Sequence, residues 1–328
     1  MGGEEQAGRV PTLYIWGAGR VGRSVALGLR ACVDPALAWE LVGAWNRTSA
    51  RAADSARVLG LPVDHGDPPT PALLRADLVL LCASDDAVAE VAAQLGPHLR
   101  PYQSFLHTSG SLSREALRQP GVVAHLGACH PLQALASPDG DPDKLRGAVF
   151  AVEGDPASLP LARRLALALG GRPVEIASEA KPLYHAAAVL SANSITALTD
   201  AACDLLGQAG LDALTGAELL LPLLEGTVQQ LRARLTAARA SQPPDAAPAT
   251  LDLAGRAALS AALTGPVRRG DAGTVGRHLV ALEALAAHDP EGPALLDLYR
   301  RLGQRALLVA QRGDLDPARA DLLRALLR

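Results

Sequence analysis

The pattern of apolar and polar positions changes along the chain, and the change falls near residue 177. Before that point, short apolar runs alternate with amphipathic stretches, which is typical of strands connected by helices. We predict strands over residues 13–16, 41–45, 77–82, 104–107, 127–130, 148–152 and 173–176, and a short one over 61–63. Strands that alternate with helices predict a doubly wound α/β sheet.

From about Ser178 onward the pattern is helical almost throughout, with long periodic runs and few β-branched clusters. Residues 237–250 are rich in proline and alanine, so we predict a loop between helices there. We therefore expect two domains, a doubly wound domain over 1–177 and an all-α domain over 178–328.

Composition and charge exclude several classes of function. The net charge of −3 leaves no basic footprint, so nucleic acid is not an expected partner. We find no signal-peptide pattern and no apolar run of about 18 residues, so we expect no membrane span. The four cysteines stand singly, and no His/Asp cluster has ligand spacing, so we expect a metal-free cytoplasmic protein.

A glycine-rich turn after the first strand is the clearest chemical signal. It reads Gly17, Ala18, Gly19, Arg20, Val21 and Gly22, and a helical run follows it. In a dinucleotide-binding turn the first glycine allows the tight turn, the second lets the backbone approach a pyrophosphate, and the third lets the helix pack closely. The free amides of the helix N terminus would then face the phosphates. The alternative is a glycine turn that holds no ligand.

The end of the second predicted strand indicates which dinucleotide is bound. Enzymes that use NAD usually carry an acid there, but this chain has Asn46, Arg47 and Thr48. A guanidinium suits a 2′-phosphate, so we predict NADP(H), with Arg47 as the chief contact. The alternative for Arg47 is a solvated loop residue. Small residues after the 77–82 strand would let the cofactor pass, namely Cys82, Ala83 and Ser84.

Two further strand ends carry histidine. His107 is followed by Ser109 and Gly110, and His130 is followed by proline. If these strands are parallel to the first, the side chains share the edge of the sheet that carries the glycine turn. Histidine suits proton transfer near neutral pH, so we predict His107, Ser109 and Gly110 as substrate contacts and His130 as catalytic. The alternative is that these residues hold turns or cap helices.

The start of the second domain offers a third group. Helical spacing places Lys181 and His185 on one face, with Asn193 two turns further along. A lysine, a histidine and an amide at a domain junction would bind and protonate a developing alkoxide or amine, so we predict all three as catalytic. The alternative is a solvated lysine, a core Tyr184 and a packed histidine.

These motifs together resemble a known family. The stretches YIWGAGRVGRSVALGLR, HTSGS, CHPLQAL, KPLYHAAAVLSAN and ALTGPVRRGD…RHLVAL resemble, in this order, Rossmann-like proteins with a DUF2520 C-terminal domain. That group belongs to the superfamily of 6-phosphogluconate dehydrogenase, with ketopantoate reductase and pyrroline-5-carboxylate reductase as relatives. The resemblance implies an NADP-binding Rossmann domain and a helical domain that supports a homodimer.

The resemblance also bears on single residues. In the relatives, the helix that opens the second domain carries a lysine with an asparagine four residues later, whereas here His185 stands four residues after Lys181. This departure leaves open which of the two is the proton donor. Arg269 lies in a stretch that resembles a family loop and is a candidate for binding a substrate carboxylate; a helix-capping turn is the alternative.

From these signals we predict an NADP-dependent oxidoreductase. It would transfer hydride to the C=O or C=N carbon of a small anionic metabolite, with a 2-oxo acid such as ketopantoate as the first guess. A non-catalytic NADP-binding redox regulator is one alternative. A prephenate-type oxidising dehydrogenase is another, suggested by the His130–Pro131 pair.

Overall fold

The computed structural model describes residues 9–67 and 70–328. The chain divides into two compact units, residues 1–195 and 196–328, and each is described by itself. The domain boundary at 177/178 expected from the sequence stays a prediction. It marks where the alternation of strands and helices gives way to helices alone, whereas the two units are defined by how compactly the chain packs.

The first unit is built on a seven-stranded sheet with the order β2-β1-β3-β4-β5-β6-β7. The strands are β1 (Thr12–Trp16), β2 (Glu40–Trp45), β3 (Leu78–Leu81), β4 (Ser104–His107), β5 (His125–Pro131), β6 (Val149–Gly154) and β7 (Arg172–Glu175). From β2 to β5 neighbouring strands are parallel, so their carboxyl ends share one edge of the sheet. Only the β5–β6 pairing is antiparallel within this sheet. The α/β fold class predicted from the sequence is confirmed.

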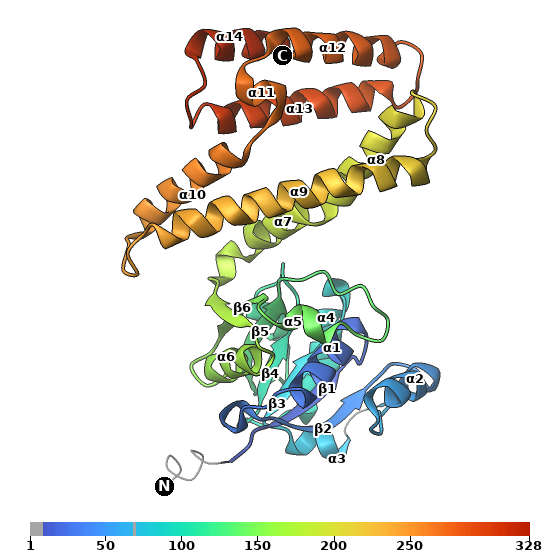
Figure 1. Ribbon diagram of the computed structural model, residues 1–328. Helices are drawn as coiled ribbons and strands as arrows, with labels where there is room; N and C mark the ends of the chain where they lie inside the picture. Colours follow the sequence, from blue (N-terminus) through green and yellow to red (C-terminus); the bar gives the residue numbers. More distant parts are fainter. Residues whose placement is uncertain (1–8, 68–69) are drawn as a thin grey trace. The chain divides into compact units, whose positions relative to one another are not determined.

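Side chains on the strands alternate between two cores, as the period of two in a strand requires. Leu13 and Ile15 of β1 face one core, which α1 (Arg20–Arg30) and α6 (Leu159–Ala168) cover. Tyr14 and Trp16 face the other, which α4 (Asp85–Leu95) covers together with α3 (Pro71–Arg75). The remaining helices of this unit are α2 (Ser49–Leu59), α5 (Pro142–Leu145) and α7 (Lys181–Ser191). Figure 1 shows helices α1 to α6 around the sheet.

One predicted strand did not form. Residues 61–63 lie beside the sheet, but only the next residue, Asp64, forms an isolated parallel bridge, to Trp45. Pro62 lacks the amide hydrogen that a ladder needs at that point, and only three apolar positions are available, which is too few to sustain a paired strand.

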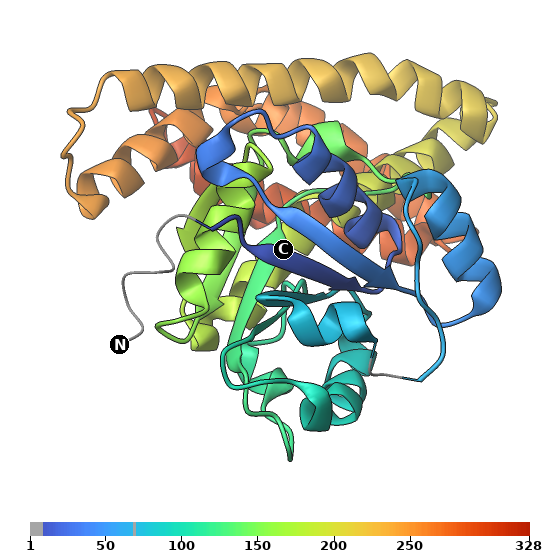
Figure 2. The same cartoon turned by 90° about the horizontal axis from the view of Figure 1, so that it is seen from below.

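The second unit consists of helices in its described residues. They are α8 (Asn193–Gly207), which begins just before the boundary, α9 (Ala213–Ala240), α10 (Pro248–Ala262), α11 (Gly265–Arg269), α12 (Ala272–Ala286), α13 (Gly292–Ala310) and α14 (Pro317–Leu326). The long α9 lies beside α10, as both views show (Figure 1 and Figure 2), and the predicted loop is shorter than expected because α9 continues to Ala240. Helices α12 to α14 enclose a core that includes Val275, Leu307 and Leu323. No helix in the described part of the chain is both long and apolar enough to cross a membrane.

Candidate functional site

The turn between β1 and α1 has the shape of an anion cradle. Gly17 has a φ of +105°, and a Cβ there would lie 2.3 Å from the carbonyl oxygen of Cys82. A Cβ on Gly22 would lie 2.4 Å from the Gly17 carbonyl oxygen, so the helix approaches the turn closely. A Cβ on Gly19 would meet no described atom within 4 Å, and no described side chain caps the start of α1. The first amides of the helix are therefore open to a negatively charged group.

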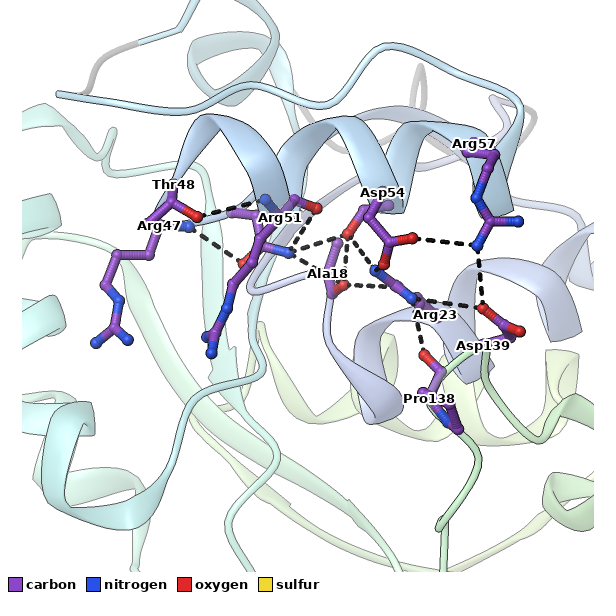
Figure 3. A network of polar contacts seen from close by, with 11 residues as sticks. Ala18, Arg23, Arg47, Thr48, Arg51, Asp54, Arg57, Pro138 and Asp139 are labelled. Atoms are coloured by element: carbon purple, nitrogen blue, oxygen red, sulfur yellow. Dashed lines mark hydrogen bonds and ion pairs between the residues drawn. The ribbon is translucent and has the colours of Figure 1, made fainter.

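The cradle is held from behind by a buried arginine that the sequence did not reveal. Arg23 is 5% exposed, and its Nε donates to the carbonyl oxygen of Ala18 at 3.1 Å. Its two terminal nitrogens donate to Asp54 Oδ2 at 2.6 Å, to Ser55 Oγ at 2.9 Å and to the Pro138 carbonyl at 2.8 Å. Figure 3 shows this network. Arg23 thereby fixes the glycine turn to α2 and to the loop that follows β5.

Asn46 and Thr48, predicted as supporting contacts to a 2′-phosphate, make hydrogen bonds within the protein, Asn46 as a buried residue and Thr48 as an exposed one. The Asn46 side chain is buried, and its Nδ2 donates to Ser55 Oγ at 3.0 Å and to the Ala18 carbonyl at 3.3 Å. Thr48 is the N-cap of α2, where its Oγ1 accepts from the Arg51 amide at 3.3 Å. Both residues therefore shape the corner at the end of β2 through internal hydrogen bonds.

The corner presents two exposed arginines, Arg47 and Arg51. In the part of the chain that the structure describes, neither guanidinium makes a hydrogen bond or ion pair. Figure 3 shows both groups directed to the same side, away from the network around Arg23. A third exposed arginine, Arg20, is the first residue of α1, and the next residue, Val21, packs against the core. Two unpaired cations directed to the same side suit a phosphate group.

The segment after β3 closes the cradle on the side of the sheet. Cys82 follows β3, and its amide donates to the Trp16 carbonyl at 2.8 Å. Burial raises the pKa of the Cys82 thiol to about 12, so this thiol stays protonated. Ala83 and Ser84 then lead into α4, and the side chain of Ser84 makes no capping bond in the described structure. This segment is small and lies next to Gly17, as a passage for a cofactor requires.

His107 is buried in the turn that follows β4. Its Nδ1 accepts from the Ser109 amide at 3.1 Å, and its Nε2 lies 3.1 Å from the Ser113 carbonyl oxygen. Burial, with the nearby Lys181, lowers the pKa of His107 to about 4, so the ring is neutral at neutral pH. The Ser109 hydroxyl accepts from the amides of Ser111 and Leu112 at 3.2 and 3.0 Å. These two side chains, predicted as substrate contacts, both hold the turn.

A pocket lies between the end of β5 and helix α7. Its apolar lining includes Leu132, Ala188 and Val189, and its polar lining comes from His130, Gln133, Tyr184, His185, Ser191 and Asn193. The structure thus brings together three of the predicted catalytic residues, His130, His185 and Asn193. The small alanines of α7 leave the space that they were expected to leave.

His130, Tyr184 and His185 form a compact aromatic group in this pocket. His130 Nδ1 lies 3.0 Å from the Tyr184 hydroxyl, and the His130 ring stands edge-on to both the Tyr184 and the His185 rings. Burial and the neighbouring charges of His185 and Lys181 lower the pKa of His130 to about 4. A Cβ on Gly110 would lie 2.6 Å from His185 Nδ1 and 2.8 Å from His130 Nε2, so only glycine fits there.

Lys181 lies deeper than predicted. Its side chain is 1% exposed, and its Nζ donates to the Ser109 carbonyl oxygen at 3.2 Å and lies 3.7 Å from Glu153 Oε1. Glu153 on β6 is itself buried, and it accepts from the Arg114 amide and from the Ser178 hydroxyl. Burial lowers the pKa of Lys181, and the carboxylate of Glu153 opposes that shift. The ammonium therefore belongs to a buried ion pair and not to the lining of the pocket.

Arg269, the predicted carboxylate contact, lies in the second unit. It is exposed at the end of α11, and Gly270, at a φ of +68°, caps that helix. The Arg269 carbonyl oxygen accepts from Arg319 at 3.1 Å, so the backbone here forms the capping turn that was the alternative prediction. The guanidinium of Arg269 stays available for a ligand.

Sequence reasoning missed three residues that organise the site, namely Arg23, Glu153 and Tyr184. A charged residue within an apolar helical face was the available signal for Arg23, and one at the end of an apolar strand was the signal for Glu153. Tyr184 was considered only as a core residue. No group of three or more His, Cys, Asp or Glu side chains among the described residues could hold a metal ion.

Comparison with known families finds one match. Residues 148–243 and 246–306 match the model of a family described as a domain of unknown function, DUF2520. The match begins at β6 and runs through most of the helical region. Among curated proteins none matches this chain.

Solved structures with the same fold include several oxidoreductases. A candidate NADP oxidoreductase from Bacteroides fragilis is 22% identical, with a TM-score of 0.63 over 90% of this chain and 98% of that chain. A 1-pyrroline-5-carboxylate reductase from Streptococcus pyogenes is 17% identical, with a TM-score of 0.54 over 90% and 97%. A reductive aminase from Aspergillus terreus, in complex with NADPH4, cyclohexanone and allyl amine, is 20% identical, with a TM-score of 0.53 over 97% and 99%. At these identities the likeness establishes a shared fold.

Proposed function

We propose that this chain, whose residues 148–243 and 246–306 match the DUF2520 model that its motifs resembled, is an NADP(H)-dependent oxidoreductase. One observation carries the proposal. The same unit holds an open, uncapped cradle at Gly19 and a polar pocket around His130. Both follow strands of the parallel part of the sheet, at the edge where doubly wound folds bind their ligands. The names of the structural neighbours support this reading.

The residues present fit an NADP(H) molecule. The open amides at the start of α1 suit a pyrophosphate. The guanidiniums of Arg47 and Arg51, which make no ion pair in the described structure, together suit a 2′-phosphate. An acid that would repel this phosphate is absent from residues 46–48. When bound, the reduced cofactor supplies hydride, and the protein supplies orientation and a proton.

The substrate we propose is a small molecule with a C=O or C=N group. Hydrogen-bonding groups of His130, Tyr184 and Asn193 converge on the pocket and could orient such a group. The described lining contains no lysine or arginine, so an anionic substrate such as a 2-oxo acid would need a cation from outside this lining. Arg269 of the second unit stays a separate candidate for binding a carboxylate. The pyrroline-5-carboxylate reductase and the reductive aminase among the neighbours favour including C=N substrates.

The test is a screen for NADPH oxidation by the full-length protein. Absorbance at 340 nm is followed with pyruvate, 2-oxoisovalerate and 1-pyrroline, each with NADPH and with NADH. We expect at least one compound to be reduced, with NADPH preferred. Binding of NADPH without turnover of any compound would favour the non-catalytic regulator, and faster oxidation of an alcohol by NADP⁺ would favour the oxidising dehydrogenase.

Arg47→Ala is expected to weaken NADPH binding by about 10- to 100-fold, because a charge-assisted contact to a phosphate contributes about 1.5–3 kcal/mol. The dissociation constant for NADH should change less than threefold, since NADH lacks the 2′-phosphate. Both constants can be measured by quenching of tryptophan fluorescence.

Arg57→Ala is the matched control for this substitution. Arg57 lies on α2, the helix that follows Arg47, and is exposed, but its guanidinium pairs with Asp54 and Asp139. Its replacement removes the same charge from the same region of the chain, so it should leave NADPH affinity within twofold. Equal losses in both variants would mean that Arg47 acts through general charge and makes no specific contact.

We also propose that the helical region supports a homodimer. The 28-residue helix α9 buries only Gly216 among its described residues, and it exposes Leu214, Leu221, Val228 and Leu235, which recur every seven residues and so share one face. An apolar face of this kind is typical of a surface that a second copy covers.

A further inference from the structure

The pocket needs a group that can give up a proton, and the predicted donors do not suit this role. Lys181 is 1% exposed, lies outside the pocket lining and is held by Glu153 and the Ser109 carbonyl. His185 turns its Nδ1 toward Gly110, where that atom is buried without a partner among the described residues. Asn193 carries an amide, which is not an acid at any working pH.

Tyr184 combines the properties that the other residues lack. It lies on α7, one turn after Lys181, and it is half-buried in the pocket lining. Its hydroxyl lies 3.0 Å from His130 Nδ1, and the two rings stand edge-on with their centroids 5.7 Å apart. The hydrogen bond with His130 therefore orients the Tyr184 hydroxyl, while one side of Tyr184 faces the pocket.

We propose that Tyr184 donates the proton to the substrate and that His130 is the positioning residue that holds the Tyr184 hydroxyl. This inference rests on the proposed reductase function. It assigns the acid to a residue that neither the sequence pattern nor the family resemblance indicated.

When bound, the reduced cofactor would supply hydride to the C=N or C=O carbon, and the π electron pair would move to the nitrogen or oxygen. The Tyr184 O–H bond breaks as the new N–H or O–H bond forms, which leaves a phenolate. With its proton on Nδ1, His130 donates a hydrogen bond to that phenolate, and solvent later returns the proton.

The electrostatic surroundings favour the starting state of this step. Burial raises the pKa of Tyr184 to about 12, so the phenol keeps its proton at neutral pH. The lowered pKa of His130, about 4, keeps the imidazole neutral. The charged and titratable groups around His130 are His185 and Lys181 on the α7 side and Asp85 at the start of α4; the first two lower its pKa and Asp85 raises it.

The experiment compares kcat, KM and NADPH affinity in the full-length protein and its variants, with whichever of pyruvate, 2-oxoisovalerate and 1-pyrroline the wild type reduces fastest. Tyr184→Phe should lower kcat by about 10²- to 10⁴-fold, the usual contribution of a general acid, and leave NADPH affinity within twofold. Tyr102→Phe removes an exposed hydroxyl that bonds the Leu74 carbonyl, and it should change kcat less than twofold.

The role of His130 is tested by rescue. His130→Asn places an amide N–H near the position of Nδ1, whereas His130→Phe offers no donor. We expect the asparagine variant to keep at least tenfold more of kcat than the phenylalanine variant. If the two variants are equally impaired at equal stability, His130 does not act through a hydrogen bond to Tyr184.

The failures of the two proposals can be told apart. If the wild type reduces a compound and Tyr184→Phe retains more than a third of kcat, Tyr184 is not the donor, and the reductase function stands. If the wild type reduces none of the three compounds, the reductase function and this inference fail together. A direct check needs no turnover: the difference in absorbance at 295 nm between wild type and Tyr184→Phe should show no phenolate up to pH 10.

Discussion

Replacing Gly17 with alanine is expected to destabilise the first unit by about 3–5 kcal/mol, because strain at a special backbone angle and overlap in a packed interior act together. The new Cβ would lie 2.3 Å from the Cys82 carbonyl oxygen, and the φ of +105° is one that residues with side chains rarely adopt. Urea unfolding monitored by tryptophan fluorescence reports this unit, because its three tryptophans, Trp16, Trp39 and Trp45, all lie there.

The matched variant is Gly19→Ala, two residues further along the same turn. Its Cβ would meet no described atom within 4 Å, so the free energy of unfolding should change by less than about 1 kcal/mol. The methyl group would instead occupy the space through which a pyrophosphate approaches the backbone, so NADPH affinity should fall at least tenfold. A Gly19→Ala variant that binds NADPH as tightly as the wild type would show that the cofactor does not lie on this turn.

Lys181→Met is expected to cost about 3–5 kcal/mol of unfolding free energy, since it leaves the buried Glu153 carboxylate without its cation. Both side chains are nearly inaccessible, with side-chain exposures of 1% for Lys181 and 6% for Glu153. Glu153→Gln should cost a similar amount by leaving the ammonium unpaired, although the amide oxygen can still accept one of the two existing hydrogen bonds. The measurement is again urea unfolding.

The double variant Lys181→Met with Glu153→Gln distinguishes the cost of an unpaired buried charge from the cost of altered side-chain packing. Because both charges are removed together, most of the loss should be recovered, leaving the protein within about 2 kcal/mol of the wild type. If the double variant loses as much unfolding free energy as the two single variants together, the two groups are not a coupled pair.

Much of the fold could be predicted because strands buried on both faces leave an unmistakable signature. The continuous apolar run 77–82 marks β3, and the alternation of such runs with helical stretches predicts the doubly wound sheet. The direction of β6 could not be predicted, since apolar content is the same for parallel and antiparallel neighbours. The strand predicted over residues 61–63 did not form although β2 is within reach at Asp64, because Pro62 lacks an amide hydrogen and the apolar run is short.

The positions of site residues at strand ends could be predicted, but the roles of those in the turn after β2 could not. His130 lies near the end of the buried strand β5, so its place at the edge of the sheet follows from topology. Asn46 and Thr48 stand where a cofactor contact was expected, but short polar side chains bond readily to nearby backbone, and here those bonds take precedence. The burial of Lys181 could not be predicted because its partner, Glu153, is 28 residues away in sequence.

The guanidinium of Arg23 connects the glycine turn to the loop that lines the pocket. It donates to the carbonyl of Ala18 in the turn and to the carbonyl of Pro138 in the segment that continues from Gln133 and Ala134. Because one planar group makes both contacts, a substitution that removes it would release the turn and this segment together.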